Sequence, residues 1–289
     1  MQTTQLTDPV CFTEVPVDIM RRTIANVRFD LLPRRQVLSV IENWRAASRR
    51  GYITLTNPHS VMMCHRDPEM RLATQQSGLT LADGVGIIVA AKVLGFGRHR
   101  RVTGPNLMLD ICDRGRESGL RHYLYGGLPG IAERLAQRLE RTYPGIEIVG
   151  TMSPPFRDLS ISEDEEIAEQ INAAMPDIIW VGLGAPKQEK WMARQSGRVE
   201  ATAMIGVGAA FDFHSGNMKW APTWMRNIGL EWFYRLGCEP RRMWRRNLDS
   251  PRFVCQVLKQ AFSQGTIPNR LPGAAERLLP PKAEQEVRG

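Results

Sequence analysis

The sequence has 289 residues and a formal net charge of +8, with 43% hydrophobic and 24% charged residues. This composition can fill a sizeable hydrophobic core, so an intrinsically disordered chain is excluded. The five cysteines are scattered without a C-x-x-C pair, which argues against a disulfide framework or a structural zinc site and favours a reducing compartment. We find no signal-peptide pattern and no window of about 18 uninterrupted apolar residues, so we expect a soluble or peripheral protein.

The sequence predicts alternating strands and helices along most of its length, because apolar runs are separated by Gly, Pro and Asn. Residues 1–20 resemble a loosely held lead-in. Strands are expected at 52–56, 79–83, 122–125, 146–150, 177–181 and 203–207. Helices are expected at 31–50, 60–76, 84–91, from 103, at 129–143, from 162 and at 186–195. This alternation predicts an α/β fold, in which a mostly parallel sheet carries helices on both faces.

The character of the chain changes after Gly216. Helices are expected at 221–236, 239–247 and 252–262, and the last twenty residues are expected to fray. We therefore divide the chain into a core, residues 1–216, and a helical, basic appendage, residues 217–289.

The positive charge is concentrated in this appendage. Residues 217–289 contain 13 Lys and Arg against 6 Asp and Glu, together with Trp220, Trp224, Trp232 and Trp244. Basic residues mixed with tryptophans are typical of surfaces that meet an anionic membrane or a nucleic-acid backbone. A solvated basic helix with tryptophans in its core is the alternative interpretation.

Asp83 is the first candidate for a functional side chain. It ends a buried strand and stands beside the start of a helix, which is where open α/β sheets bind their ligands. An Asp before a helix can also be only an N-cap. Two further glycine-rich turns follow strands, at Gly126-Gly127 and at Gly182-Leu183-Gly184, and would let the backbone approach a phosphate or a sugar.

Several enzyme classes lack their motifs in this sequence. There is no G-x-G-x-x-G fingerprint, no G-x-x-x-x-G-K-[ST] loop and no G-x-S-x-G elbow, so nicotinamide enzymes, P-loop NTPases and α/β-hydrolases are poor interpretations. No metal site is expected, because Asp212 and His214 could hold an ion only weakly. Arg and backbone N–H groups would then have to neutralise a bound diphosphate. Arg101 is a candidate for this role, with an ordinary surface arginine as the alternative.

Six blocks in the same order resemble the WecG/TagA/CpsF glycosyltransferases, between about residues 27 and 248. The blocks are Asn57-Pro58, Ala82 to Gly86, Arg101 to Gly104, Val181 to Trp191, Gly206 to Phe213, and Arg226 to Arg235 with Pro240 to Arg245. The resemblance implies a Rossmann-like core with a C-terminal appendage. It also implies inverting, metal-independent transfer of a sugar from a nucleotide donor, usually a UDP-sugar, to a polyprenyl-diphosphate-linked saccharide.

The resemblance implies a place for this reaction as well. Family members work in cell-surface polysaccharide biosynthesis, on capsule, exopolysaccharide or teichoic-acid-like glycans, at the cytoplasmic face of the plasma membrane. We therefore expect a peripheral membrane protein that needs no cofactor, does not bind nucleic acid and is compatible with a homo-oligomer.

Roles for individual residues follow from the same resemblance. Asp83 matches the catalytic base that deprotonates the acceptor hydroxyl, or a residue that orients the acceptor. The substrate-binding candidates are Thr56, Asn57, Arg101, Gly126, Gly184 and Gln188. The candidates for binding the diphosphate of donor or acceptor are Arg235, Arg242 and Arg245. Arg241 and Arg246 match membrane-facing charges.

The sequence departs from the family pattern in three places. Many members have Glu where His59 stands, which leaves the donor sugar open between N-acetylmannosamine, glucose and glucuronate. The family threonine usually stands where Leu55 is, so Thr56 would have to replace it. The chain beyond Leu248 is longer than expected. A non-catalytic basic protein that binds a membrane or nucleic acid is the alternative function, although tryptophans in helices beside apolar residues favour a membrane.

Overall fold

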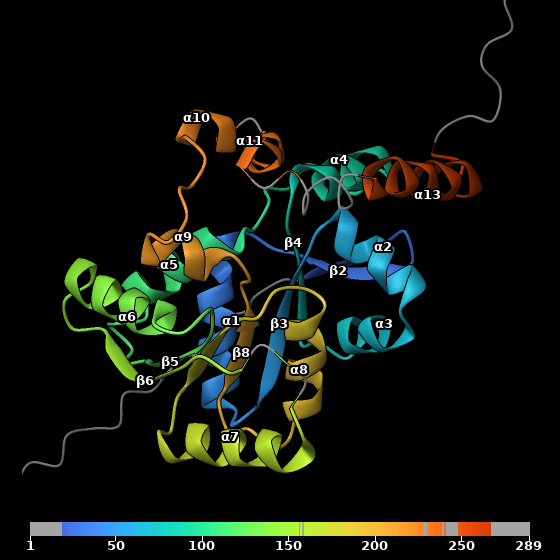
Figure 1. Cartoon of the computed structure of the whole chain (residues 1–289). Coiled ribbons are helices and arrows are strands. Elements are labelled where there is room, and N and C mark those ends of the chain that lie inside the picture. Colours follow the sequence, from blue (N-terminus) through green and yellow to red (C-terminus); the bar gives the residue numbers. More distant parts are fainter. Residues whose placement is uncertain are drawn as a thin grey trace, which may run out of the picture.

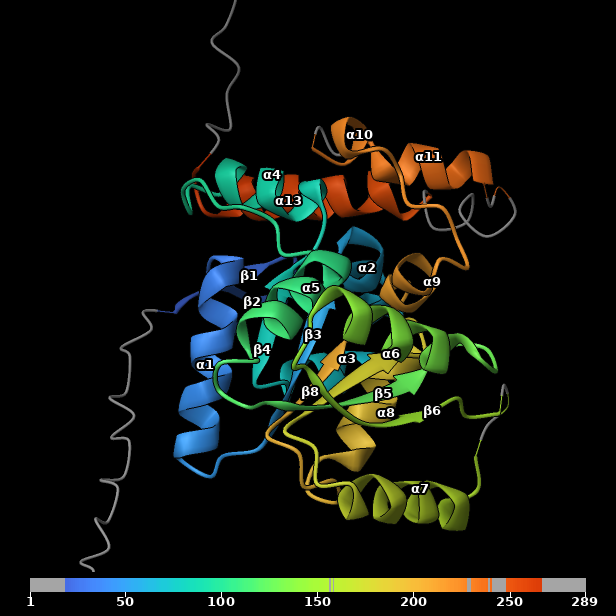
Figure 2. The same ribbon diagram turned by 90° about the vertical axis from the view of Figure 1, so that its left-hand side faces the viewer.

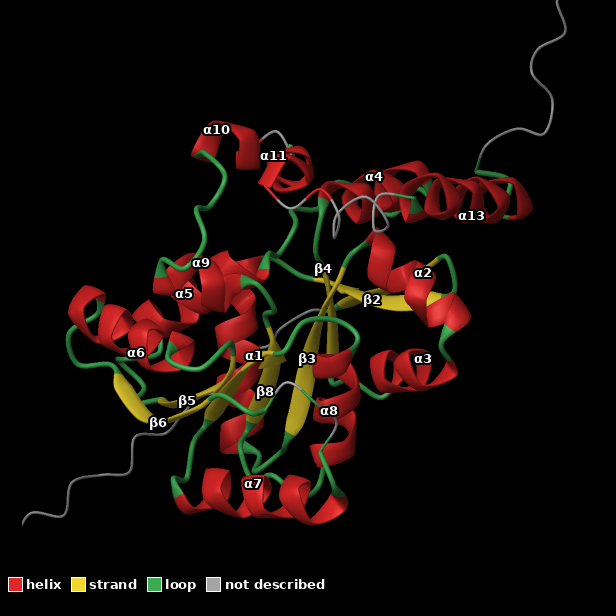
Figure 3. Cartoon of the chain, in the orientation of Figure 1, coloured by secondary structure: helices red, strands yellow, loops and turns green. Residues whose placement is uncertain are grey.

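The computed structural model describes residues 19–155, 157, 159–227, 230–238, 240 and 248–266. Six parallel strands form the central sheet in the order β4-β3-β8-β7-β5-β6 (Figures 1 and 3). Their bounds are β3 (Gly51–Thr56), β4 (Leu79–Ala82), β5 (Arg121–Gly126), β6 (Glu147–Met152), β7 (Ile178–Gly182) and β8 (Ala203–Gly206). The predicted α/β class with a parallel sheet is confirmed.

Helices cover both faces of this sheet. One face packs against α1 (Arg34–Ala46), α5 (Gly104–Arg114) and α6 (Ile131–Thr142), and the other against α7 (Ile161–Ala173) and α8 (Lys187–Gln195). In β7 the alternation is visible directly, since Trp180 joins the first core and Val181 joins the second. Burial on both faces explains why the strands are continuous apolar runs.

A third core lies beside β4 and was not expected in this form. It joins a hairpin, β1 (Met20–Ile24) and β2 (Val27–Leu31), to α2 (Pro58–Arg66), α3 (Pro68–Gln75), α4 (Val85–Val93) and α13 (Asp249–Ser263). We expected residues 1–20 to be a lead-in and a helix to start at 31, so the hairpin was missed. Its turn, Ala25-Asn26, has φ of 47° and 62°, as two-residue hairpin turns require, but it lacks the glycine that usually marks such a turn.

The single helix expected at 60–76 is two helices. Pro68 has no N–H to continue the hydrogen bonding of α2, so the helix is interrupted at Asp67. The Asp67 carboxylate then caps α3, accepting hydrogen bonds from the N–H groups of Glu69 and Met70, both at 3.1 Å. The break turns α3 away from α2, so that α3 also packs on α8.

The C-terminal part holds α9 (Ala210–Ser215), α10 (Thr223–Asn227), α11 (Glu231–Cys238) and α13. The helix expected at 221–236 is therefore split into α10 and α11. Figures 1 and 2 place α4, α10, α11 and α13 together, at the end of the molecule where β3 and β4 finish. The helix predicted at 239–247, the expected lead-in at 1–18 and the expected frayed tail lie outside the described residues, apart from Pro240.

The helix α13 is part of a core, although it lies in the predicted appendage. It packs against α2 and α4, and its residues Phe253, Val257 and Ala261 are at most 5% exposed. Among the described residues beyond Leu248, a stretch longer than the family pattern predicts, α13 thus contributes to the third core.

Candidate active site

Asn57 and Asp83 are held side by side by the sheet. The register of the parallel strands β3 and β4 pairs Thr56 with Ala82, so the next residue in each chain is at the carboxyl edge of the sheet. The N–H of Asp83 donates to the carbonyl oxygen of Thr56 at 3.0 Å, which extends the ladder past the strand ends. This edge is where parallel sheets place their ligands.

Two glycines let the helix α4 begin directly after Asp83. Gly84 is the N-cap residue of α4, with φ of 97°. Residues other than glycine rarely adopt this backbone conformation. A Cβ on Gly86 would lie 2.6 Å from Cγ of Pro58. The start of α4 is therefore packed tightly on the Asn57-Pro58 turn, and both polar residues are fixed relative to it.

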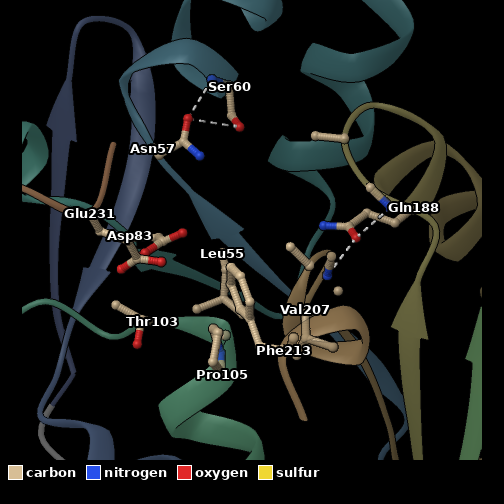
Figure 4. A pocket seen from close by; sticks show the side chains of 17 residues that line it. Leu55, Asn57, Ser60, Asp83, Thr103, Pro105, Gln188, Val207, Phe213 and Glu231 are labelled. Atoms are coloured by element: carbon tan, nitrogen blue, oxygen red, sulfur yellow. Dashed lines mark hydrogen bonds between the residues drawn. The ribbon is translucent and has the colours of Figure 1, made fainter. Parts of the chain in front are cut away.

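Asn57 is the N-cap of α2. Its Oδ1 accepts hydrogen bonds from the N–H of Ser60 at 3.1 Å and from the Ser60 hydroxyl at 3.4 Å. Figure 4 shows the amide nitrogen pointing away from Ser60, toward the interior of a pocket. The capping interaction thus sets the orientation of the amide and presents its donor side.

Gln188 holds together the loops that follow β7 and β8. Its Oε1 accepts hydrogen bonds from the N–H groups of Gly184 at 3.2 Å and Gly208 at 3.1 Å, while its Nε2 donates to Glu189 at 2.9 Å. The side chain is only 4% exposed. Gln188 thus shapes the wall of the pocket opposite Asp83 (Figure 4).

These residues line one polar pocket at the carboxyl edge of β3, β4, β7 and β8. The polar pocket is lined by Leu55, Asn57, Ser60, Asp83, Thr103, Gly104, Pro105, Gly184, Ala185, Gln188, Gly206, Val207, Gly208, Ala209, Ala210, Phe213 and Glu231. Backbone from four glycines contributes to this lining, which suits close approach of a sugar or phosphate.

An apolar groove opens next to the polar pocket, between α4, α11 and α13. The groove is lined by Asn57, Pro58, His59, Asp83, Gly84, Val85, Gly86, Val89, Ala90, Val93, Arg101, Leu230, Glu231, Trp232, Ser250, Pro251, Phe253, Val254, Val257 and Leu258. Asn57, Asp83 and Glu231 line both cavities. The two carboxylates therefore stand where the cavities join.

The half-buried histidine next to the pocket has a structural role. His214 follows the pocket residue Phe213 on α9, and its Nε2 lies 2.9 Å from the carbonyl oxygen of Pro105 at the start of α5. Burial lowers the pKa of His214 below its usual value, so the imidazole is neutral near pH 7. The neutral ring fastens α9 to α5 and so fixes one wall of the pocket.

No group of three or more His, Cys, Asp or Glu side chains able to hold a metal ion occurs among the residues that the structure describes. The two residues considered for a weak site have other partners, since Asp212 accepts from Asn217 at 3.0 Å and His214 contacts Pro105. The expectation of a metal-independent reaction stays a prediction, because it concerns the chemistry and not this geometry.

The structure brings together part of the predicted site. Asp83, Asn57, Gly184 and Gln188 line the polar pocket, and Arg101 lines the apolar groove, where its Nη2 donates to the carbonyl oxygen of Arg226.

Two predicted substrate-binding residues do not line either cavity. Thr56 is 1% exposed, and Leu55, the position of the family threonine, lines the pocket in its place. A Cβ on Gly126 would lie 2.6 Å from the backbone of Gly182, so this glycine serves the close approach of β5 and β7. Contacts of Thr56 and Gly126 with substrate stay predictions.

The predicted diphosphate-binding arginines cannot be placed at the site. Arg235 lies on α11 without a described side chain, and Arg242 and Arg245 lie outside the described residues. Arg241 and Arg246 lie outside them as well.

Glu231 is a charged pocket residue that we did not predict. It is the first residue of α11 and comes from a segment more than 140 positions from Asp83. The only signal for it was its place in the C-terminal block of the family resemblance, because the local pattern of a helix start explains an acidic residue without any function.

The fold and the pocket define an α/β enzyme whose site lies at the carboxyl edge of a parallel sheet. The chain belongs to the glycosyl transferase WecG/TagA/CpsF family, whose model matches residues 22–266. The resemblance stated from the sequence is thereby confirmed, and the chain is a glycosyltransferase.

Three curated relatives carry the name N-acetylglucosaminyldiphosphoundecaprenol N-acetyl-beta-D-mannosaminyltransferase. The chain is 31% identical over 212 residues to the protein of Bacillus spizizenii, covering 73% of this chain and 80% of that one. It is 30% identical over 214 residues to the Bacillus subtilis protein, covering 74% and 81%. For the Staphylococcus aureus protein the identity is 28% over 238 residues, covering 82% and 91%.

Proposed function

We propose that this protein transfers a sugar from a UDP-sugar to a saccharide that is linked through a diphosphate to a polyprenol. The proposal is carried by one observation, the position of Asp83 in a polar pocket of a chain that belongs to a glycosyltransferase family. The names of the relatives support the acceptor class, since those proteins are named for N-acetylglucosaminyldiphosphoundecaprenol.

The reaction would be a single inverting displacement. Asp83 takes the proton of the acceptor hydroxyl as its oxygen attacks the anomeric carbon, the bond from that carbon to the diphosphate breaks, and UDP leaves with the bonding electron pair. Attack comes from the face opposite UDP, so the configuration inverts. Asn57 and Gln188, together with the backbone of Gly184, are suited to bind donor hydroxyl and phosphate groups.

The leaving group must be neutralised without a metal in this proposal. Arg101 supplies one guanidinium near Asp83, and the N-terminal N–H groups of α4 supply a partial positive charge. Arg235, Arg242 and Arg245 are the further cations that we assign to the diphosphate of donor or acceptor, by family resemblance.

The donor sugar is open between N-acetylmannosamine and glucose or glucuronate. His59, which stands where many members have Glu, contacts Asp249 through Nδ1 at 2.6 Å and lines the apolar groove. One ring nitrogen of His59 is thus used to hold the start of α13. A donor requirement based on Glu at that position therefore does not transfer to this chain.

We propose that the protein works as a peripheral protein on the cytoplasmic face of the plasma membrane. None of the described helices is long and apolar enough to cross a bilayer. The exposed apolar side chains Trp224, Phe233 and Phe262 are 62%, 57% and 42% exposed, and they belong to the helices gathered at one end of the molecule (Figure 2). Aromatic side chains of this kind suit a membrane interface.

The decisive experiment measures UDP release from a panel of UDP-sugars, with a short-chain prenyl-diphosphate-linked N-acetylglucosamine as acceptor. We expect acceptor-dependent release that persists in EDTA and collapses in Asp83→Asn. Loss of release in EDTA would overturn the metal-independent mechanism. Acceptor-independent release alone would overturn the proposed acceptor class, and the active sugar would decide between the donors.

A homo-oligomer is compatible with this proposal and can be tested separately by sedimentation with and without anionic vesicles.

Trp224→Ser should weaken vesicle binding by about tenfold, because an exposed tryptophan is lost from the interface. Ile161→Ser is the matched control, since Ile161 is 75% exposed on α7, away from that end. Equal loss in both variants would contradict the assigned membrane-facing end.

A further inference from the structure

Two helices from distant parts of the sequence build the apolar groove. Val85, Val89 and Val93 repeat every four residues on α4, and Val254 and Leu258 do so on α13. Four of these side chains stay exposed to solvent, with Val85 at 39%, Val89 at 53%, Val254 at 52% and Leu258 at 39%. Contiguous exposed aliphatic surface of this kind marks a binding site.

The groove is continuous with the polar pocket. Asn57, Asp83 and Glu231 line both cavities, and Arg101 lines the groove beside them. A ligand that runs through both cavities would meet a polar pocket, the carboxylates of Asp83 and Glu231, the Arg101 guanidinium and an aliphatic wall. A molecule with a polar head, an anionic joint and a long apolar tail matches this combination of surfaces.

We propose that the apolar groove binds the first isoprene units of the acceptor's polyprenyl chain. This assignment rests on the proposed function, because it places the acceptor sugar at Asp83. A polyprenyl chain has no hydrogen-bonding groups, and the aliphatic side chains of α4 and α13 offer it a surface that is unfavourable to water. Its diphosphate falls beside Arg101, whose guanidinium has five N–H donors, of which one contacts the carbonyl oxygen of Arg226.

The proposal gives the helix α13 a role in substrate binding. The groove has its second wall only because α13 is fixed against α2 and α4. Arg66 of α2 donates to both carboxylate oxygens of Asp249, at 2.9 and 2.7 Å, at the start of α13. The exposed face of α13 is therefore presented to α4 in a defined position.

A membrane surface or a second copy of this chain could also cover the groove, and the experiments must distinguish these from a polyprenyl chain. Trp224 and Phe233 are exposed at the same end of the molecule but do not line the groove, so contact with the bilayer can be removed without changing the groove. Val89 and Val254 line the groove from opposite walls. Substituting both with serine keeps the charge unchanged and changes only the apolar surface.

The first test measures transfer to N-acetylglucosamine linked through diphosphate to a geranyl or a farnesyl chain, in solution without vesicles or detergent. For the wild type we expect the farnesyl acceptor to have a KM at least about tenfold lower at unchanged kcat, because five more apolar carbons are buried. In Val89→Ser/Val254→Ser the ratio of the geranyl KM to the farnesyl KM should fall below about threefold. Leu72→Ser, which removes a 53% exposed leucine on α3, is the matched control and should keep the wild-type ratio.

The second test needs no turnover. Trp232 lines the groove and is 48% exposed, so its fluorescence should shift when farnesyl diphosphate binds and should not shift with inorganic diphosphate. Trp232→Phe should remove this signal. The double serine variant should weaken farnesyl diphosphate binding by about tenfold.

The outcomes separate this inference from the proposed reaction. If farnesyl diphosphate binds as expected but no sugar is transferred, the groove assignment stands and the reaction fails. If sugar is transferred with equal KM for both chains, the reaction stands and the groove assignment is overturned. It is also overturned if the serine variant changes only binding to acceptor-free vesicles or only the oligomeric state.

Discussion

The N–H of Asp83 donates a hydrogen bond to the carbonyl oxygen of Thr56, 3.0 Å away, one residue beyond the end of β4. Because this bond uses backbone atoms only, it is retained when the Asp83 side chain is changed. Substitutions of the Asp83 carboxylate therefore test its chemistry with little disturbance of the fold.

Asp83→Asn should lower kcat by about 10² to 10⁴, the range typical for removal of a general base. The free energy of unfolding should change by less than about 1 kcal/mol. Steady-state transfer assays across pH, combined with urea unfolding, measure both effects. If Asp83 is the base, the acidic limb of the pH–rate profile should disappear in the variant.

Glu231→Gln separates the base from a residue that orients the acceptor. Glu231 lines the same pocket from α11, and its substitution should raise KM for the acceptor more than it lowers kcat. The roles are reversed if Glu231→Gln abolishes turnover while Asp83→Asn retains it.

Gly86→Ala should disturb the junction between α4 and the Asn57-Pro58 turn. The added Cβ would lie 2.6 Å from Cγ of Pro58, and relief of such overpacking costs about 1–3 kcal/mol of stability. We expect a lower free energy of unfolding and a lower kcat, measured by urea unfolding and transfer assays. Gly237→Ala is the matched control, because outside α11's own backbone and the neighbouring residues no atom of the described chain lies within 4 Å of a Cβ at Gly237, and it should be neutral or stabilising.

Gln188→Ala removes the acceptor that joins the loops after β7 and β8. The N–H of Gly184 loses its acceptor, and the N–H of Gly208 keeps only its longer bond to the carbonyl oxygen of Val181, at 3.4 Å, so stability should fall by about 2 kcal/mol. Gln188→Glu keeps the acceptor but places a second carboxylate oxygen against Glu189, to which Nε2 now donates. We expect the loss of unfolding free energy in Gln188→Glu to be smaller at pH 5 than at pH 8, because protonation relieves the repulsion between the two carboxylates. Equal losses at both pH values would contradict this arrangement.

Asp249→Asn should weaken the attachment of α13. Burial raises the pKa of Asp249, but hydrogen bonds from Arg66 and His59 outweigh this effect and hold the pKa below its usual value of 3.8; Arg252 also lies 3.7 Å away. Since the folded pKa is the lower one, the stabilisation is complete above about pH 4 and is lost as the pH falls through the folded pKa. The variant should lose about 2–3 kcal/mol at pH 7.

The measurement is urea unfolding of wild type and Asp249→Asn between pH 7 and pH 3. The difference in unfolding free energy between the two proteins should become smaller only toward pH 3. Glu165→Gln serves as control, because its pair with Arg198 spans 3.9 Å between side chains that are 56% and 49% exposed. That substitution should cost less than about 0.5 kcal/mol at any pH.

The local pattern of the chain determined the secondary elements and one edge of the site. Apolar runs ended by Asn57-Pro58 and by Asp83-Gly84 identified two strands and the residues that follow them, because Asn-Pro and Asp-Gly pairs mark turns. Two local features were misinterpreted. The hairpin turn at Ala25-Asn26 lacks glycine, and Pro68 was passed over inside an apparently continuous helix.

Only the tertiary structure decided which of these elements meet. Periodicity shows which face of a helix is apolar but not the surface that covers it, so the packing of α13 on α4 and the groove between them were invisible in the sequence. The same holds for Gln188, which joins two loops from different strands, and for Glu231, which reaches the pocket from α11. The sequence by itself determined the α/β alternation and the placement of Asp83 and Asn57 at strand ends, whereas long-range packing decided how the pocket closes and what lies beside it.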